Sequence, residues 1–140
     1  MDHSTLKSYT THLLEIRRLE IRKKQLEAEL RAVSLSSPGF EVAEGQNPNR
    51  NNKGISPKEI ATATRINQIS KLIGARSLLI QEVEEFLSFC DLENREIFTM
   101  RFVAGFSFNS VEFRTGVSRK TFSRRVEAWL EKYNEIRDYR

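Results

Sequence analysis

The chain has 140 residues, which suits one domain, or a small domain with an elongated accessory part, and argues against a large enzyme core. Hydrophobic residues make up 39% and charged residues 30%, a balance that suits long exposed helices with narrow apolar seams. The net charge of +4 is a modest bias towards polyanions, so the positions of the basic residues matter more than their number.

The sequence lacks the usual motifs of catalysis, because it has no glycine-rich phosphate loop, no nucleophile motif and no paired Cys or His ligands. The single cysteine, Cys90, cannot form an internal disulfide, and we expect it to be a small apolar residue on a helix seam. We therefore expect no enzymatic activity, no cofactor and no metal site. The N-terminus has no signal-peptide pattern and no window approaches the roughly 18 apolar residues of a membrane span, so we expect a cytoplasmic protein without a membrane partner.

A long helix is expected over about 4–33, which contains no Gly or Pro and is rich in Leu, Glu, Lys and Arg. A stripe along it recurs at alternating steps of three and four residues: Tyr9, His12, Ile16, Leu19, Lys23, Leu26, Leu30 and Val33. Charged residues flank the stripe, as they do where two helices bury only a seam. His12 and Lys23 interrupt the stripe, and polar residues at such positions commonly set the register of the pairing.

Residues 34–55 contain two prolines and three glycines and are expected to form a flexible polar loop. Ser56 and Pro57 then start a helix that runs to about Cys90, because serine can cap the helix and proline tolerates its first position. Its seam is expected to comprise Ile66, Ile69, Ile73, Arg76, Ile80, Val83, Leu87 and Cys90. Three further residues widen it: Leu72, Leu79 and Phe86. Both long helices would measure roughly 45 to 50 Å, so they match as an antiparallel hairpin over residues 1–90.

Three shorter helices are expected over 91–140, as a small helix-turn-helix domain that completes an all-α fold. Asp91 is the N-cap of the first. Its apolar side is expected to consist of Leu92, Ile97, Phe98 and Met100. Ser107 caps the second helix, which Gly116 closes with a positive backbone angle. Ser118 caps the last helix.

The last helix separates its charges along its length. Apolar residues between Phe122 and Tyr133 mark the face that packs on the preceding helices, the first two turns are basic, and the later turns are acidic. The N-terminal part of such a helix is the part that enters a major groove, where arginine suits guanine edges and phosphate oxygens. A basic N-terminus is unfavourable to the helix itself, so a bound polyanion explains it better than packing does. The DNA-binding candidates are Arg114, Ser118, Arg119, Lys120, Thr121, Ser123, Arg124 and Arg125.

Three stretches within 91–133, a region of about a third of the chain, resemble the promoter-reading C-terminal domain of bacterial sigma factors. They are REIFTMRF at 95–102, GFSF at 105–108 and GVSRKTF at 116–122. More of the chain is similar to small late transcriptional regulators of phages and prophages, the ArpU and RinA type, in which a sigma-like C-terminus follows two long helices. The resemblance implies a regulator of late genes, with an activator favoured, that binds promoter DNA through its last helix, with host RNA polymerase or a sigma factor as a further partner.

Two positions depart from the sigma pattern. Glu112 stands where the pattern has a small residue packed between two helices, and Thr115 stands where it has a large aliphatic residue. Either the helix pair crosses differently, or the short helix is rotated so that Phe113 faces inward.

One module with a single short recognition helix reads only a few base pairs, so we expect a homo-oligomer, with a dimer favoured. Two alternatives stay open. One is a viral DNA-packaging recognition subunit of the small-terminase kind, and the other is a module that binds RNA polymerase or a sigma factor without reading DNA. The operator, the sign of regulation and the role of residues 34–55 also stay open.

Overall fold

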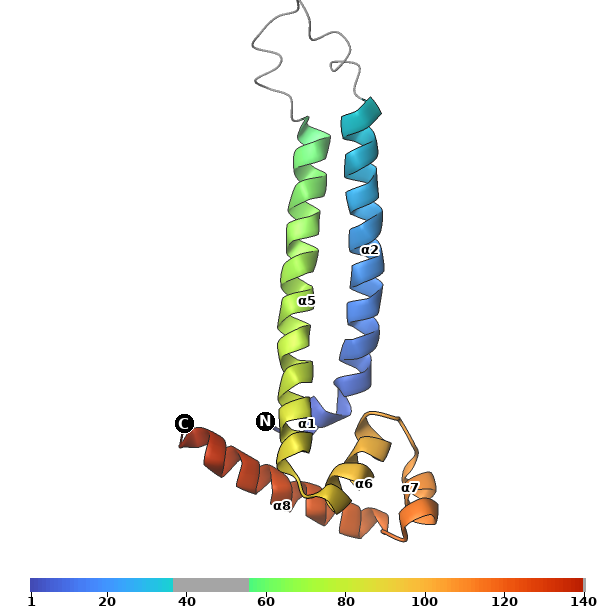
Figure 1. Ribbon diagram of the computed structural model, residues 1–140, viewed down its shortest axis with the longest axis vertical. Helices are drawn as coiled ribbons and strands as arrows, with labels where there is room; N and C mark the ends of the chain where they lie inside the picture. Colours follow the sequence, from blue (N-terminus) through green and yellow to red (C-terminus); the bar gives the residue numbers. More distant parts are fainter. Residues whose placement is uncertain (37–55, 140) are drawn as a thin grey trace, which may run out of the picture. The chain divides into compact units, whose positions relative to one another are not determined.

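The computed structural model describes residues 1–36 and 56–139, in which the chain forms six helices and no strand (Figure 1). The all-α class expected from the sequence is therefore confirmed. The helices are α1 (His3–Lys7), α2 (Tyr9–Ser36), α5 (Pro57–Phe89), α6 (Leu92–Phe102), α7 (Phe108–Thr115) and α8 (Arg119–Asp138). The chain divides into two compact units, of which the first combines Met1–Glu15 with Arg76–Arg140 and the second is Ile16–Ala75.

The helix expected over 4–33 is interrupted at Ser8, which lies between the end of α1 and the start of α2. The Ser8 hydroxyl donates a hydrogen bond to the carbonyl oxygen of Ser4 at 2.7 Å. Serines that bond back in this way compete with the backbone and bend helices. The prediction of one continuous helix was wrong because helix propensity does not register this competition.

The start of the expected loop was also placed too early, since α2 continues to Ser36. Of the loop expected at 34–55, residues 37–55 lie outside the described residues. The second helix begins as predicted. The side-chain oxygen of Ser56 accepts a hydrogen bond from the amide of Glu59 at 3.1 Å, and Pro57 occupies the first helical position.

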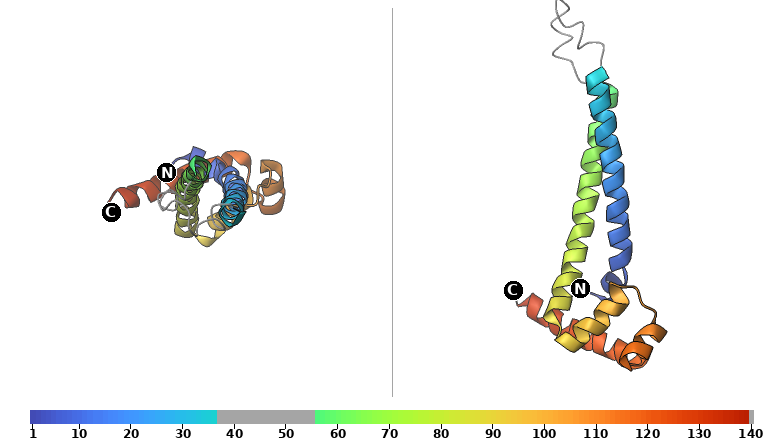
Figure 2. Two further views of the ribbon diagram at one scale, coloured as in Figure 1. Left: turned by 90° about the horizontal axis from the view of Figure 1, so that it is seen from above. Right: turned by 45° about the vertical axis from the view of Figure 1, so that its right-hand side comes forward.

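In the second unit, residues 16–36 of α2 and 57–75 of α5 run side by side in opposite directions (Figures 1 and 2). Ile16 and Leu26 are buried there, and the other seam positions of this unit are half-buried. Leu72 was expected to widen the seam but is 52% exposed. That expectation was wrong because two helices alone cover only a narrow stripe of each other.

The core of the first unit joins α1 and the last turns of α5 to α6, α7 and α8. Its buried side chains are Leu6, Tyr9, Val83, Phe86, Leu87, Cys90, Ile97, Phe98, Phe102, Val111, Phe122, Val126, Leu130 and Tyr133. Aromatic rings connect the helices: Phe98 stacks on Phe86 with 6.2 Å between centroids and meets the edge of Phe122 at 5.5 Å. Burial of rings of this size contributes a large share of core stability.

The last turns of α5 belong to the same compact unit as α6–α8. The domain boundary expected after residue 90 stays a prediction from the sequence. Leu92, expected on the apolar side of α6, is 65% exposed. That expectation was wrong because the buried side of α6 is formed by Ile97, Phe98 and Phe102, and Leu92 at the first helical position is not part of it.

Candidate nucleic-acid interface

The turn between α7 and α8 is built by local hydrogen bonds that the sequence largely foretold. Gly116 has a φ of 75°, and its amide donates to the carbonyl oxygen of Glu112 at 2.7 Å. Ser118 caps α8 by accepting a hydrogen bond from the amide of Thr121 at 3.2 Å. Asp91 and Ser107 cap α6 and α7 in the same way, so these predicted caps are confirmed.

Thr115 has a structural role in the turn between α7 and α8. Its hydroxyl donates to the carbonyl oxygen of Val111 at 2.6 Å and accepts from the amide of Val117 at 3.2 Å. One side chain thereby ties the last turn of α7 to the start of the loop before α8. A large aliphatic side chain could make neither hydrogen bond.

The orientation of α7 is set by Val111, which is 1% exposed, with Phe108 packed against the core. Phe113 is 92% exposed, so the alternative in which it turned inward is wrong. Glu112 is also exposed, and its carboxylate therefore needs no partner inside the helix pair.

Two of the candidate residues, Arg114 and Arg119, lie against aromatic rings. The guanidinium of Arg119 lies 4.5 Å from the centre of the Phe108 ring, and that of Arg114 lies 4.8 Å from the centre of the Phe106 ring. Such cation–π contacts restrict long side chains while leaving their donors available. Both arginines remain exposed.

Arg101 is a further cation beside these rings that the sequence-based list of candidates did not include. Its guanidinium lies 4.2 Å from the centre of the Phe108 ring, and Nη1 donates to the carbonyl oxygen of Phe106 at 3.1 Å. Phe108 thus contacts two guanidinium groups and also makes a T-shaped contact with Phe122, with 5.5 Å between ring centroids. The arginine followed by an aromatic residue at the end of α6 was the only sequence signal for it.

Lys120 and Arg124 are the open cations of α8. Both are exposed, and neither has an ion pair or hydrogen bond within the part of the chain that the structure describes. They lie four residues apart, so they share one face of the helix. A polyanion could therefore meet both side chains without breaking an existing contact.

Other DNA-binding candidates make contacts within the protein. The hydroxyls of Ser118 and Thr121 are hydrogen-bonded to each other at 3.0 Å, and Ser123 is half-buried. Arg125 lies towards α6, where Nη1 is 3.4 Å from the carboxylate of Glu93 and 3.4 Å from the side-chain oxygen of Asn94. Arg119, Lys120 and Arg124 are thus exposed on α8, whereas Arg125 is turned towards α6.

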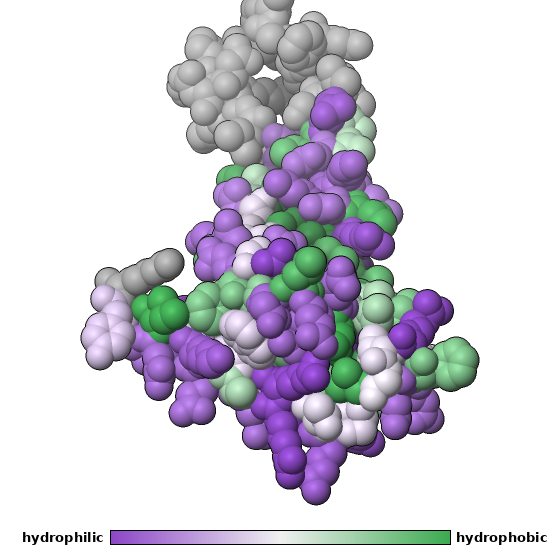
Figure 3. Space-filling view, turned by 60° about the horizontal axis from the view of Figure 1, so that its bottom comes forward, coloured by the Kyte–Doolittle hydropathy of each residue, from purple (hydrophilic) through white to green (hydrophobic). Residues whose placement is uncertain are grey.

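The acidic side chains of α8, Glu127, Glu131, Glu135 and Asp138, are all exposed. Spacings of four, four and three place them on one face, in line with Lys120 and Arg124. The surface view in Figure 3 shows a face on which hydrophilic side chains predominate and hydrophobic ones form separate small patches. The open face of α8 therefore changes from positive to negative along its length.

The structure also places the residues of metal and redox chemistry. No group of three or more His, Cys, Asp or Glu side chains among the described residues could hold a metal ion. Cys90 is buried, as predicted, at 2% exposure, but it lies one residue past the end of α5 and not on the helix itself. Burial raises the pKa of its thiol to about 12. Among the described helices, none contains a stretch long and apolar enough to cross a membrane.

Comparison of the chain with protein-family models, with curated proteins and with solved structures finds no match.

Proposed function

We propose that this protein is a sequence-specific DNA-binding transcriptional regulator of phage or prophage origin that reads promoter DNA through α8. The observation that carries the proposal is the open basic start of α8, where Arg119, Lys120 and Arg124 are exposed beside the buried ring cluster. Basic residues at a helix N-terminus oppose the helix dipole, so they lower stability unless an anion is bound. Acids follow only from Glu127 onwards, and they would keep the rear of the helix away from phosphates.

In the proposed mechanism, α6–α8 act as a sigma-like helix-turn-helix. The first turns of α8 enter the major groove, and Arg119 and Arg124 supply paired donors to base edges. Lys120 and Arg114 contact phosphates, which set orientation without reading sequence. Arg125 joins them by exchanging its Glu93 partner for a phosphate, since that ion pair is largely exposed and exposed ion pairs are weak.

The proposed setting is the cytoplasm of a host bacterium, without enzymatic activity, and with host RNA polymerase or a sigma factor as a second partner. The long α2 and α5 would form a helical hairpin that carries the reading domain and brings copies together. A single short helix reads few base pairs, so more than one copy is needed for useful specificity.

The test is selection of bound sequences from random duplex DNA by the purified chain at about 0.15 M salt, where nonspecific phosphate binding is already weakened. We expect enrichment of one short motif. Arg119→Ala with Arg124→Ala should weaken binding to it about tenfold or more, because each bidentate base contact contributes about 1–3 kcal/mol. Arg65→Ala with Lys71→Ala removes the same charge from exposed positions of α5 and should change binding little. Absence of enrichment would remove the promoter-reading proposal.

One observation favours the second candidate, a module that binds RNA polymerase or a sigma factor. Phe113 is 92% exposed on α7, and exposed aromatic side chains are frequent anchors of protein interfaces. Phe113→Ala should then abolish polymerase binding and leave DNA selection unchanged. Retention of polymerase binding by this variant would exclude Phe113 as an anchor.

A further inference from the structure

One face of α2 in the second unit combines cations with apolar side chains, and none of the described residues packs on it. Arg17, Ile21, Lys24, Ala28 and Arg31 follow each other at steps of four and three, and all five are exposed. We call these residues the basic face of α2. Ile21 is 59% exposed, and no cation of this face has an ion pair within the described chain. From residue 17 to 31 the helix carries six cationic and three anionic side chains.

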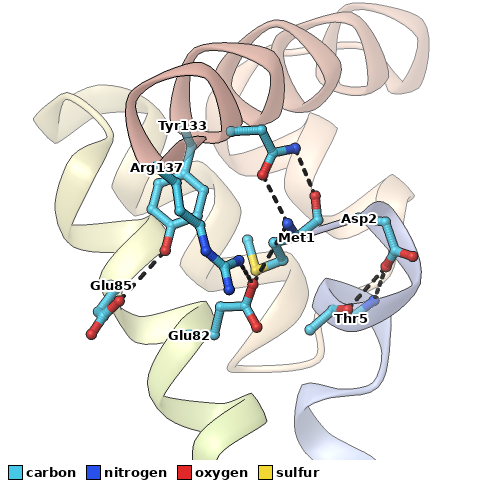
Figure 4. A network of polar contacts seen from close by, with 8 residues as sticks. Met1, Asp2, Thr5, Glu82, Glu85, Tyr133 and Arg137 are labelled. Carbon is cyan, nitrogen blue, oxygen red and sulfur yellow. Dashed lines mark hydrogen bonds and ion pairs between the residues drawn. The ribbon is translucent and has the colours of Figure 1, made fainter. Parts of the chain in front are cut away.

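The first unit contains a groove of the opposite character between α5 and α8. Its volume is about 600 Å³. Its lining, here called the acidic groove, comprises Gln81, Glu84, Glu85, Ser88, Phe89, Tyr133, Ile136 and Arg137. The one cation among these residues, Arg137, is paired with Glu82 (Figure 4). The charge of the groove is therefore set by Glu84 and Glu85.

The acidic groove is fixed in shape by contacts at its edges. The Tyr133 hydroxyl donates to Glu85 at 3.5 Å and the Tyr9 hydroxyl donates to Glu84 at 3.3 Å, so both carboxylates are held in place (Figure 4 shows the first). Burial, and then the charge of Glu85, raise the pKa of Tyr133. Ile136 is 47% exposed and provides apolar surface beside these charges.

We propose that the basic face of α2 in one copy docks in the acidic groove of a second copy. Ile21 would rest on the apolar surface of Phe89 and Ile136, and Arg17 and Lys24 would lie beside Glu84 and Glu85. The two cations flank Ile21 by four and three residues, so they lie about one helical turn to either side of it. An apolar centre with a charged rim is the common composition of a specific protein interface.

The argument for a second copy is that both members of a complementary pair occur on the same chain. Residues 81–89 contain three acids and no cation, and residues 127–138 contain four acids and two cations. This negative field excludes nucleic acid from the groove and attracts the net positive segment of α2. The contact is heterologous, because different surfaces meet, so symmetry does not stop it at two copies. It concerns self-association and does not depend on DNA reading.

The experiment is a charge exchange, read by sedimentation over a range of concentrations. Arg17→Glu with Lys24→Glu, and separately Glu84→Lys with Glu85→Lys, should each weaken self-association of the full chain about tenfold or more, because two ion pairs become two repulsions. An equimolar mixture of the two variants should recover the wild-type mass, since each reversed surface then finds a complementary one. Arg65→Glu with Lys71→Glu makes the same charge change on exposed positions of α5 and should leave the mass unchanged.

Circular dichroism of each variant checks that the helices are intact, and Glu84→Gln with Glu85→Gln provides a milder version of the groove change. A monomeric wild type, or a mixture that stays as dissociated as its components, would overturn the proposal. So would loss of DNA affinity in Arg17→Glu with Lys24→Glu at unchanged mass, because the basic face would then serve nucleic acid. Self-association with no DNA selection would leave this inference standing and remove only the proposed regulator.

Discussion

The guanidinium of Arg119 lies 4.5 Å from the centre of the Phe108 ring, across the turn that joins α7 to α8. Arg101 contacts the same ring at 4.2 Å, so α6, α7 and α8 meet at one aromatic side chain. A cation–π contact contributes about 0.5–1 kcal/mol at an exposed site, which is enough to favour one placement of a flexible arginine. Arg119, the first side chain proposed to contact bases, is thus already positioned in the protein alone.

The positioning of Arg119 can be measured as a coupling between two substitutions. Phe108→Leu keeps an apolar side chain but removes the ring, and Arg119→Ala removes the side chain proposed to read bases. We expect their effects on affinity for the selected DNA to be non-additive by about 0.5–1 kcal/mol, the contribution of the contact they share. Phe108→Leu combined with Arg124→Ala should be additive, because Arg124 does not touch the ring. Additivity in both cycles would show that the ring does not position Arg119.

Lys120 is predicted to lower the stability of the folded protein. A cation in the first turn of α8 opposes the helix dipole, and Lys120 has no ion pair in the described structure to offset this. Lys120→Glu should therefore raise the free energy of unfolding by about 0.5 kcal/mol while weakening DNA binding. Asp138→Lys corrects the dipole at the other end of α8 and should stabilise without weakening DNA binding. Chemical denaturation and a DNA titration together decide the outcome.

Substitutions at Gly116 are predicted to lower stability through the backbone conformation and not through steric clashes of the added side chain. Its φ is 75°, and an added Cβ would meet nothing within 4 Å. Gly116→Ala should cost about 1–2 kcal/mol of unfolding free energy, because alanine is strained in the left-handed region. Gly116→Asn should cost less, since asparagine tolerates that region. Equal losses for the two variants would mean that another contact is responsible.

The environment of His12 predicts that the folded protein loses stability in mild acid. Arg76 Nη1 lies 2.9 Å from His12 Nδ1, and arginine can only donate, so the ring accepts there. Burial first, and then the Arg76 charge, lower the pKa of His12 below its usual 6.5. A lowered folded-state pKa contributes stability above pH 6.5 that is lost as the pH falls through the folded value. The melting temperature should drop less between pH 7 and pH 5 in His12→Asn than in the wild type, and an unchanged drop would contradict the assignment.

Many features of this protein could be predicted from the sequence because they depend on neighbours along the chain. The caps at Asp91, Ser107 and Ser118 and the positive φ of Gly116 are decided within four residues. The seams of α2 and α5 follow from helical period, with Leu72 as an exception. The segregation of charge along α8 is likewise a property of one helix.

Packing between helices decided the rest. Whether Arg125 faces outward depends on Glu93, which lies 32 residues away, and whether Arg119 is held depends on the ring that α7 presents. The hydrogen bonds of Thr115, by contrast, are local, because they reach only Val111 and Val117. Local patterns set which helices form, because backbone hydrogen bonds and caps are short-range. The partner of each exposed charge requires the tertiary fold, because side chains distant in sequence become neighbours only when the helices pack.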